Sequence, residues 1–207
     1  FAAENGLDVD FQLVDLMTGE HMKPAYAAIN PNCQVPVLEE DGFRLTESSA
    51  ILKYLAEKTG SPAYPAELRK RARVNEMMDW LNTGLYRDLG YGFIYPQILP
   101  NYRRPTDDQQ AGTIAWGKEK AKRWLQILDA NLIGPRGAYL CGDKISIADY
   151  LGAPMLTLGE LIRCDFSAYP NIKRWLANMK GLKSWNKVNE AFYGLVGSVK
   201  DTKFEAI

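Results

Sequence analysis

Asn30-Pro-Asn-Cys-Gln-Val-Pro-Val-Leu38 is the stretch that decides the fold of this chain, together with the segment Leu45-Thr-Glu-Ser-Ser-Ala-Ile-Leu-Lys-Tyr-Leu55 that follows after a short turn. The two segments have the order strand, turn, strand, helix. Pro36 lies inside the first strand-like run, although proline cannot donate to a strand ladder and holds the preceding residue in an extended conformation. We therefore expect Pro36 to face a partner other than a neighbouring strand.

The second segment begins its helix with Glu47-Ser48. The first N–H groups of a helix have no partner within it, and the positive end of the helix dipole favours a carboxylate or a phosphate. Pro36 and this helix start are therefore interpreted as the two ends of one small-ligand cleft.

The composition is that of a globular protein without net charge. The 207 residues suit one large domain or two small ones, and a hydrophobic share of 46% can build a core. Lysine and arginine number 25, as do aspartate and glutamate, so no net field favours nucleic acid or an anionic membrane. No apolar run approaches the roughly 20 residues that span a bilayer. We expect neither nucleic acid nor a membrane as a partner.

The three cysteines indicate a reducing compartment. Cys33, Cys141 and Cys164 are odd in number, widely spaced and without a CxxC pair. This usage is typical of reduced thiols in a cytosolic protein. No secretory signal is visible, so we expect a cytoplasmic location.

The first third of the chain has the pattern of an α/β domain. Residues 1–6 have the pattern of the end of a helix, and Leu7–Val14 alternates as a strand does. Residues 34–39 and 43–46 are expected to form strands around the hairpin signal Asp41-Gly42. Because Phe1 is not an initiator methionine and the chain begins inside an element, we expect a segment upstream of Phe1.

The remainder is predicted to be helical. The composition changes abruptly at the Pro- and Gly-containing residues 59–65. Ser146-Ile-Ala-Asp149 is a capping box in its acidic variant, so Asp149 is interpreted as a structural cap. The helices are expected at residues 67–95, 106–132, 147–162, 169–179 and 184–192.

These patterns predict an α/β domain followed by an all-α domain. We expect an incomplete thioredoxin-like domain at residues 1–58, a linker at residues 59–66 and a helical bundle at residues 67–207. A proline at the edge of such a sheet would offer the backbone of Val35 to an extended peptide, as in strand addition.

This order of motifs resembles the cytosolic glutathione S-transferase superfamily, most closely the theta class and its bacterial relatives. The resemblance covers nearly the whole chain. It rests on the motifs Asn30-Pro31, Val35-Pro36, Leu45-Thr-Glu-Ser-Ser-Ala-Ile51, the linker tyrosine and proline, Arg71-Ala-Arg73, Ser146-Ile-Ala-Asp149, and Val14-Asp15-Leu16 followed by Gly19-Glu20-His21.

The resemblance implies a glutathione site with a direction. It assigns Glu47 and Ser48 to the γ-glutamyl end, the Val35 backbone to the cysteinyl unit, and Gln34 with His21 to the glycine end. It also implies that Pro36 follows a cis peptide bond. These assignments suit glutathione, because the tripeptide carries two carboxylates and one ammonium group.

The activity implied is attack of the glutathione thiolate on a hydrophobic electrophile, by conjugation or dehalogenation, with glutathione as the co-substrate. The family's activating residue, Ser, Tyr or Cys, is expected upstream of Phe1, so no catalytic residue is assigned. A homodimer is implied, with contacts through the first two helices of the second domain. The alternatives are a non-catalytic binding or scaffolding module and a glutathione-dependent disulfide oxidoreductase, which needs an upstream cysteine.

Several of these residues also have a simpler interpretation. His21, the only histidine, has the pattern of a surface residue and forms no metal site alone, so no metal is expected. Cys33 has no resolving partner and suits a partly buried thiol, and Ser48 suits a helix cap. The candidate substrate-pocket residues Tyr86, Tyr91 and Tyr95 have a spacing that also fits core or dimer contacts.

Overall fold

The computed structural model describes residues 1–207, and its only sheet is a two-stranded hairpin. Strand β1 (Val37–Glu40) pairs antiparallel with β2 (Phe43–Thr46), and the register runs from Val37 opposite Thr46 to Glu40 opposite Phe43. Asp41 and Gly42 have φ angles of 49° and 81°, the left-handed conformation that a two-residue hairpin turn requires. The hairpin expected at Asp41-Gly42 is thus confirmed, although β1 begins after Pro36.

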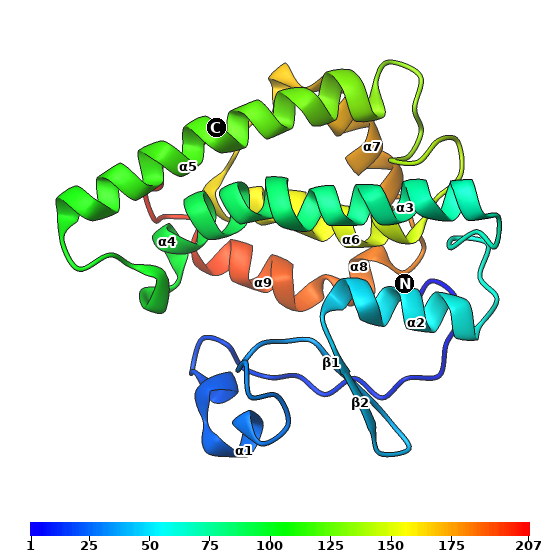
Figure 1. Cartoon of the computed structure of the whole chain (residues 1–207). Helices are drawn as coiled ribbons and strands as arrows, with labels where there is room; N and C mark the ends of the chain where they lie inside the picture. The colour runs from blue at the N-terminus through cyan, green and yellow to red at the C-terminus, as the bar shows by residue number, and fades with distance from the viewer.

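Three short helical elements complete the N-terminal part. They are the 3₁₀ turn Glu20–Met22, α1 (Pro24–Ala27) and α2 (Ser48–Lys58). Figure 1 shows the hairpin and α1 on one side of the larger helical part, with α2 between them. The helix end expected at residues 1–6 is confirmed, since Leu7 N donates to Ala2 O and Gly6, at φ 67°, donates to Ala3 O. These two hydrogen bonds form a Schellman motif.

The strand predicted at Leu7–Val14 does not form. Residues 8–14 make no backbone hydrogen bond, and Phe11 and Leu13 remain 73% and 82% exposed. Alternation of apolar residues indicates which face a strand would bury, but the ladder needs a second strand beside it. No other described segment lies in that position, so the chain crosses this region as an irregular extension.

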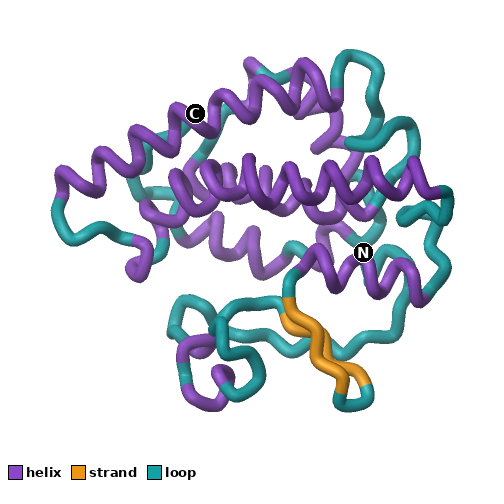
Figure 2. The backbone as a smooth tube through the Cα atoms, in the orientation of Figure 1, coloured by secondary structure: helices purple, strands orange, loops and turns teal.

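The helical part contains the elements expected from the sequence, with shifted ends. Residues 68–98 are helical throughout, and α8 and α9 replace the single last helix that was predicted (Figure 2). The α-helices are α3 (Leu68–Trp80), α4 (Tyr95–Ile98), α5 (Asp107–Ile127), α6 (Ile147–Thr157), α7 (Pro170–Lys180), α8 (Trp185–Val188) and α9 (Glu190–Ser198). None of the helices combines the length and the apolar composition needed to cross a bilayer.

The long helix predicted at residues 67–95 changes its winding halfway. Residues Leu81–Ile94, between α3 and α4, form a π-helical segment, and Leu128–Ile133 after α5 form a second one. A π-helix closes i→i+5 hydrogen bonds and is rare, so the α-helical period assumed from the sequence is wrong here. The wider turn changes which side chains share a face.

Helix α6 lies at the centre of the helical core, as predicted. Ile147 and Leu156 are fully buried in it. The capping box is present, and Asp149, with no exposed surface, accepts hydrogen bonds from Ser146 N, Ser146 Oγ, Leu140 N and Trp175 Nε1, all at 2.8 Å. Asp149 therefore joins the start of α6 to α7 and to the preceding loop, which is more than a local cap.

The residues between α2 and α3 are packed against the helical part. Ala63 and Tyr64 are buried, and Ala63 O accepts a hydrogen bond of 2.9 Å from Ile147 N at the start of α6. Arg71 Nε donates to Pro65 O at 2.8 Å, and its guanidinium group lies 4.7 Å from the Tyr64 ring centre. This connection holds α2, and with it the start of the candidate site, against the helical core.

Helix α5 and the π-helical segment Leu81–Ile94 cross at two glycines. A Cβ atom added to Gly117 would lie far inside van der Waals contact with the Gly92 carbonyl group, which is backbone and cannot rotate away. The two helix backbones therefore touch at this crossing, and the close approach requires glycine at position 117, whereas a Cβ atom at Gly92 would make only ordinary contacts of 3.5 Å.

Candidate functional site

The hairpin register brings the two halves of the predicted cleft together. Val37 and Thr46 form the last pair of the ladder, so Pro36 and Glu47 are the next residues on the two adjacent chains. Neighbouring strands lie about 5 Å apart. Val35 and Ser48, each two residues beyond the last pair, therefore lie at the same end of the hairpin.

Val35 presents an unpaired backbone at this end. The Val35-Pro36 peptide bond is cis, as the resemblance implied. Neither Val35 N nor Val35 O makes a hydrogen bond with another protein atom, and the residue is 40% exposed. A free donor and a free acceptor on one extended residue are what an added peptide strand needs.

A buried asparagine fixes the loop before Val35. Gln34 O accepts hydrogen bonds from Tyr26 Oη at 2.8 Å and from Asn30 Nδ2 at 2.7 Å. Asn30 also accepts from Cys33 N through its backbone carbonyl at 2.9 Å. Sequence reasoning missed the roles of Tyr26 and Asn30, although an asparagine before Pro31 is the residue that a side-chain-bonded turn favours.

The start of α2 is an open anion site. Ile51 N makes the first hydrogen bond of the helix, to Glu47 O, so the N–H groups of Ser48, Ser49 and Ala50 are free. Glu47 occupies the N-cap position at φ 65° and makes no side-chain capping bond. A left-handed conformation is rare for a residue other than glycine and costs energy. The interpretation of Ser48 as a helix cap is wrong, because Ser48 lies after the cap position and its hydroxyl group caps no N–H.

His21 lies in the 3₁₀ turn before α1. Glu20 N donates to Asp15 O at 3.0 Å, and Asp15 N donates to Glu20 Oε2 at 2.8 Å, which fixes the chain up to this turn. His21 is half-buried, and its Nδ1 atom is buried without a hydrogen-bond partner. His21 and Gln34 make no hydrogen bond with each other, and the side chain of Gln34 is exposed. An unpartnered buried nitrogen is a candidate ligand contact.

Tyr86, Tyr91 and Tyr95 form one aromatic cluster, to which the structure adds Tyr102. The ring centres of Tyr91 lie 5.1 Å from Tyr86, 5.2 Å from Tyr95 and 5.7 Å from Tyr102. The first three residues are five and four positions apart, and the wide π-helical turn brings such positions onto one face. In an α-helix of 3.6 residues per turn, Tyr86 and Tyr91 would point apart.

Electrostatics link this cluster to the start of α2. Burial raises the pKa of Tyr91 to about 12, and Tyr86, Tyr102 and the Glu47 carboxylate contribute in the same direction. Tyr91 therefore lies close enough to Glu47 for the two groups to interact.

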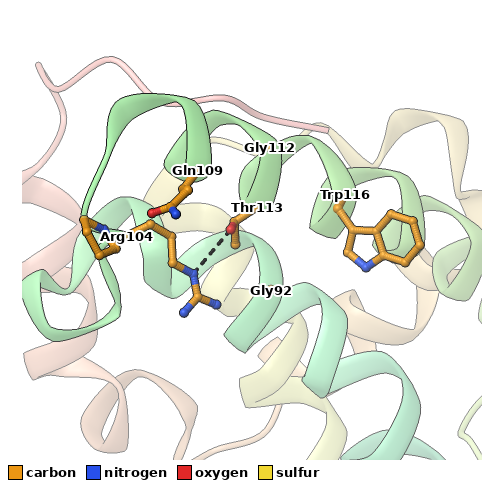
Figure 3. A pocket seen from close by; sticks show the side chains of 7 residues that line it. Gly92, Arg104, Gln109, Gly112, Thr113 and Trp116 are labelled. Carbon is orange, nitrogen blue, oxygen red and sulfur yellow. Dashed lines mark hydrogen bonds between the residues drawn. The ribbon is translucent and has the colours of Figure 1, made fainter.

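A pocket lies elsewhere, beside α5. It has a volume of about 700 Å³ and is formed around the crossing of α5 with the π-helical segment (Figure 3). Arg104 Nε donates to Thr113 Oγ1 at 3.3 Å beside it, and Trp116 at its rim is 61% exposed. Its lining residues are Gly92, Arg104, Pro105, Gln109, Gly112, Thr113 and Trp116. None of the predicted glutathione-site residues lines this pocket.

Comparisons with known proteins agree on one family. The family descriptions "Glutathione S-transferase, N-terminal domain" and "Glutathione S-transferase, C-terminal domain" match residues 1–57 and 95–182. The chain is 33% identical to glutathione S-transferase theta-1 of Bos taurus over 179 residues, which cover 84% of this chain and 73% of that protein.

Two solved structures share the fold. The apo form of human glutathione S-transferase T1-1 has a TM-score of 0.80 and 29% identity, with 99% of this chain and 85% of that chain covered. A delta-class glutathione transferase of Nilaparvata lugens has a TM-score of 0.77 and 29% identity, with 96% of this chain and 91% of that chain covered. With a thioredoxin-like N-terminal part, a helical C-terminal part and theta-class relatives, the chain belongs to the glutathione S-transferase family.

Proposed function

We propose that this transferase binds glutathione at the hairpin end, between Val35 and the start of α2. The γ-glutamyl carboxylate accepts from the free N–H groups and the hydroxyl group of Ser48, while Glu47 binds the ammonium group. Val35 pairs with the cysteinyl unit, and Gln34 and His21 bind the glycine carboxylate. The observation that supports this most strongly is the unpaired Val35 backbone beside three unbonded helix N–H groups.

In this proposal, each of three successive parts of the chain has its own role. Residues 1–58 hold glutathione, residues 59–66 link the parts, and residues 67–207 supply the electrophile pocket with Tyr86, Tyr91 and Tyr95. The bound thiolate attacks a hydrophobic electrophile in a conjugation or dehalogenation reaction that detoxifies it in the cytoplasm. The three free cysteines are compatible with that compartment.

Retention on glutathione-agarose tests the site. Replacing Glu47 by glutamine and Ser48 by alanine together removes a charge partner and a hydroxyl donor. Hydrogen bonds to charged groups contribute about 2 kcal/mol each, so the affinity is expected to fall at least roughly 30-fold. Ser49→Ala is the matched control, because it removes the adjacent hydroxyl group from the same helix turn and should leave retention unchanged.

Equal retention of the wild type and the Glu47→Gln, Ser48→Ala variant would contradict the site assignment. A folded wild-type protein that fails to bind glutathione at all would favour the alternative of a scaffolding module. A disulfide oxidoreductase would instead bind glutathione and reduce mixed disulfides.

We propose further that two copies of this chain pair across the face formed by α5 and the π-helical segment Leu81–Ile94. This face carries the pocket of about 700 Å³ described above and the exposed Trp116. Large exposed aromatic side chains are enriched at interfaces. A two-fold axis would set the same surface of both copies together.

Sedimentation velocity tests this pairing. The wild type is expected to sediment as a dimer, and Trp116→Glu as a monomer, because the substitution buries an unpaired charge at the interface. Val188→Glu, which changes a 53% exposed side chain on α8, is the control and should remain dimeric. A monomeric wild type would refute the dimer, and a dimeric Trp116→Glu variant would refute this face.

A further inference from the structure

The chain that follows α9 is attached to the rest of the protein at few points. Helix α9 itself contains no buried residue, and residues 199–207, which we call the strap, pass from its end toward α5 (Figure 1). Segments held by few, solvent-exposed contacts are those that open locally while a protein stays folded. The hydrogen bonds that reach the strap from outside α9 come from Gln97, Lys118, Arg163 and Asp165.

Arg163 holds the first half of the strap. Its guanidinium group donates hydrogen bonds to Lys200 O at 3.0 Å, to Val199 O at 3.5 Å and to Thr202 O. These carbonyl groups follow the end of α9, where unpaired carbonyl groups and the negative end of the helix dipole favour a cation. The same guanidinium group lies 5.6 Å from the ring centre of Phe204, within the range of a cation–π contact. One side chain therefore binds four successive parts of the strap.

The second half of the strap is held at Glu205 and Ile207. Gln97 Nε2 donates to Glu205 O at 3.1 Å and Gln97 Oε1 accepts from Glu205 N at 2.8 Å, so this amide side chain pairs with the strap as a strand backbone would. Lys118 Nζ donates to the Glu205 carboxylate at 3.0 Å, and Asp165 N donates to Ile207 O at 2.5 Å. The strap therefore joins α4 and α5 to a third part of the helical core.

The thiol of Cys164 lies between the strap and the core. A Cβ atom added to Gly159 would lie 3.4 Å from Cys164 Sγ, so the core packs against one side of the thiol. Burial raises the pKa of this thiol, whereas the backbone of Ile207 in the strap and the charge of Lys118 act in the opposite direction. A cysteine reacts as its thiolate and only where a reagent can reach it. Cys164 is therefore expected to be unreactive while the strap is in place.

We propose that the strap opens as one unit while the helical core stays folded, and that this opening makes Cys164 accessible to reagents in solution. Opening breaks the hydrogen bonds of the four anchors and exposes two half-buried apolar side chains of the strap, Phe204 and Ile207, but no fully buried residue. Its free-energy cost is therefore smaller than that of global unfolding. The rate at which Cys164 reacts is the reactivity of the free thiol multiplied by the fraction of molecules with an open strap.

Labelling of the full chain with iodoacetamide, read by mass spectrometry of each cysteine peptide, measures this opening. The thiolate forms a C–S bond and iodide leaves. Arg163→Gln removes the guanidinium group, so Cys164 is expected to react about tenfold faster, the effect of losing hydrogen bonds to a charged group. Gln97→Ala loosens the other half of the strap and should also accelerate Cys164, because one unit opens at both anchors. Arg136→Gln, which removes an exposed arginine outside the strap, is the matched control and should react at the wild-type rate.

Cys141 is the reference within the same molecule, because it is also half-buried and its thiol lies 3.9 Å from Arg73 O on α3. Acceleration of Cys164 alone, in both anchor variants, supports the strap. If Cys141 accelerates by the same factor, the variants unfold globally and the proposal is wrong. It is equally wrong if either anchor variant leaves the Cys164 rate unchanged, or if Cys164 of the wild type already reacts as fast as in urea. The measurement uses no glutathione, so its result is independent of the proposed function.

Discussion

Replacing Asp149 by alanine is expected to lower the free energy of unfolding by about 4 kcal/mol, because the change leaves several buried donors without an acceptor. The carboxylate accepts four hydrogen bonds of 2.8 Å from three parts of the core, namely Ser146, Leu140 and the indole of Trp175. Loss of an exposed helix cap alone costs about 1 kcal/mol. The larger value follows from burial, since water cannot reach the donors that are left.

Urea denaturation of the wild type and the variant measures this difference. Asp165→Ala is the matched control, because Asp165 is an exposed aspartate that caps a 3₁₀ turn by accepting from Ser167 N at 2.8 Å. It should cost about 1 kcal/mol. The refolding yield of Asp149→Ala should drop, while glutathione affinity per folded molecule stays unchanged. Equal losses for the two variants would show that Asp149 acts only as a local cap.

Gly117→Ala is expected to lower the free energy of unfolding by about 3 kcal/mol. The added methyl group would overlap the Gly92 carbonyl group at the crossing of α5 with the π-helical segment. Both sides of this contact are helical backbone, so relief requires the two helices to separate. Separation also removes packing from the fully buried Leu89 and Phe93 on the same segment.

The control for this prediction is Gly194→Ala in α9. A Cβ atom at Gly194 meets nothing within 4 Å, so alanine there should raise stability by roughly 0.5 to 1 kcal/mol through its better helix propensity. Thermal unfolding followed by circular dichroism distinguishes the expected loss of stability in Gly117→Ala from the expected gain in Gly194→Ala. A neutral Gly117→Ala would mean that the helices can move apart at little cost.

Local chemistry in the sequence predicts the parts of the fold that depend on few residues. Asp41-Gly42 alone specifies a hairpin, and Ser146 with Asp149 specifies the start of a helix. The strand expected at Leu7–Val14 is wrong because a strand depends on a partner, which alternation does not reveal. The winding of Leu81–Ile94 was missed for a related reason, because the close packing against α5 has no local sequence signal.

The candidate site likewise contains residues that the sequence indicates and residues that it does not. Pro36 and Glu47 were recognisable, since proline in a strand and a helix start are unusual features with a direct physical meaning. Tyr26 and Asn30 were not, because their hydrogen bonds to Gln34 O exist only after the loop has folded back. Tyr102 joins the aromatic cluster from beyond the end of the helix, where no periodicity indicates it.

The hairpin also keeps the geometry of the ligand site apart from a place where the chain can be modified, two requirements that often conflict in protein engineering. Its open end, after Val37 and Thr46, sets the geometry of the site, whereas its turn at Asp41-Gly42 lies at the opposite end of the ladder and is exposed. Exposed loop tips tolerate inserted residues better than any other position. The turn is therefore the place to attach a fluorophore or an affinity tag that reports on the protein while leaving its ligand contacts untouched.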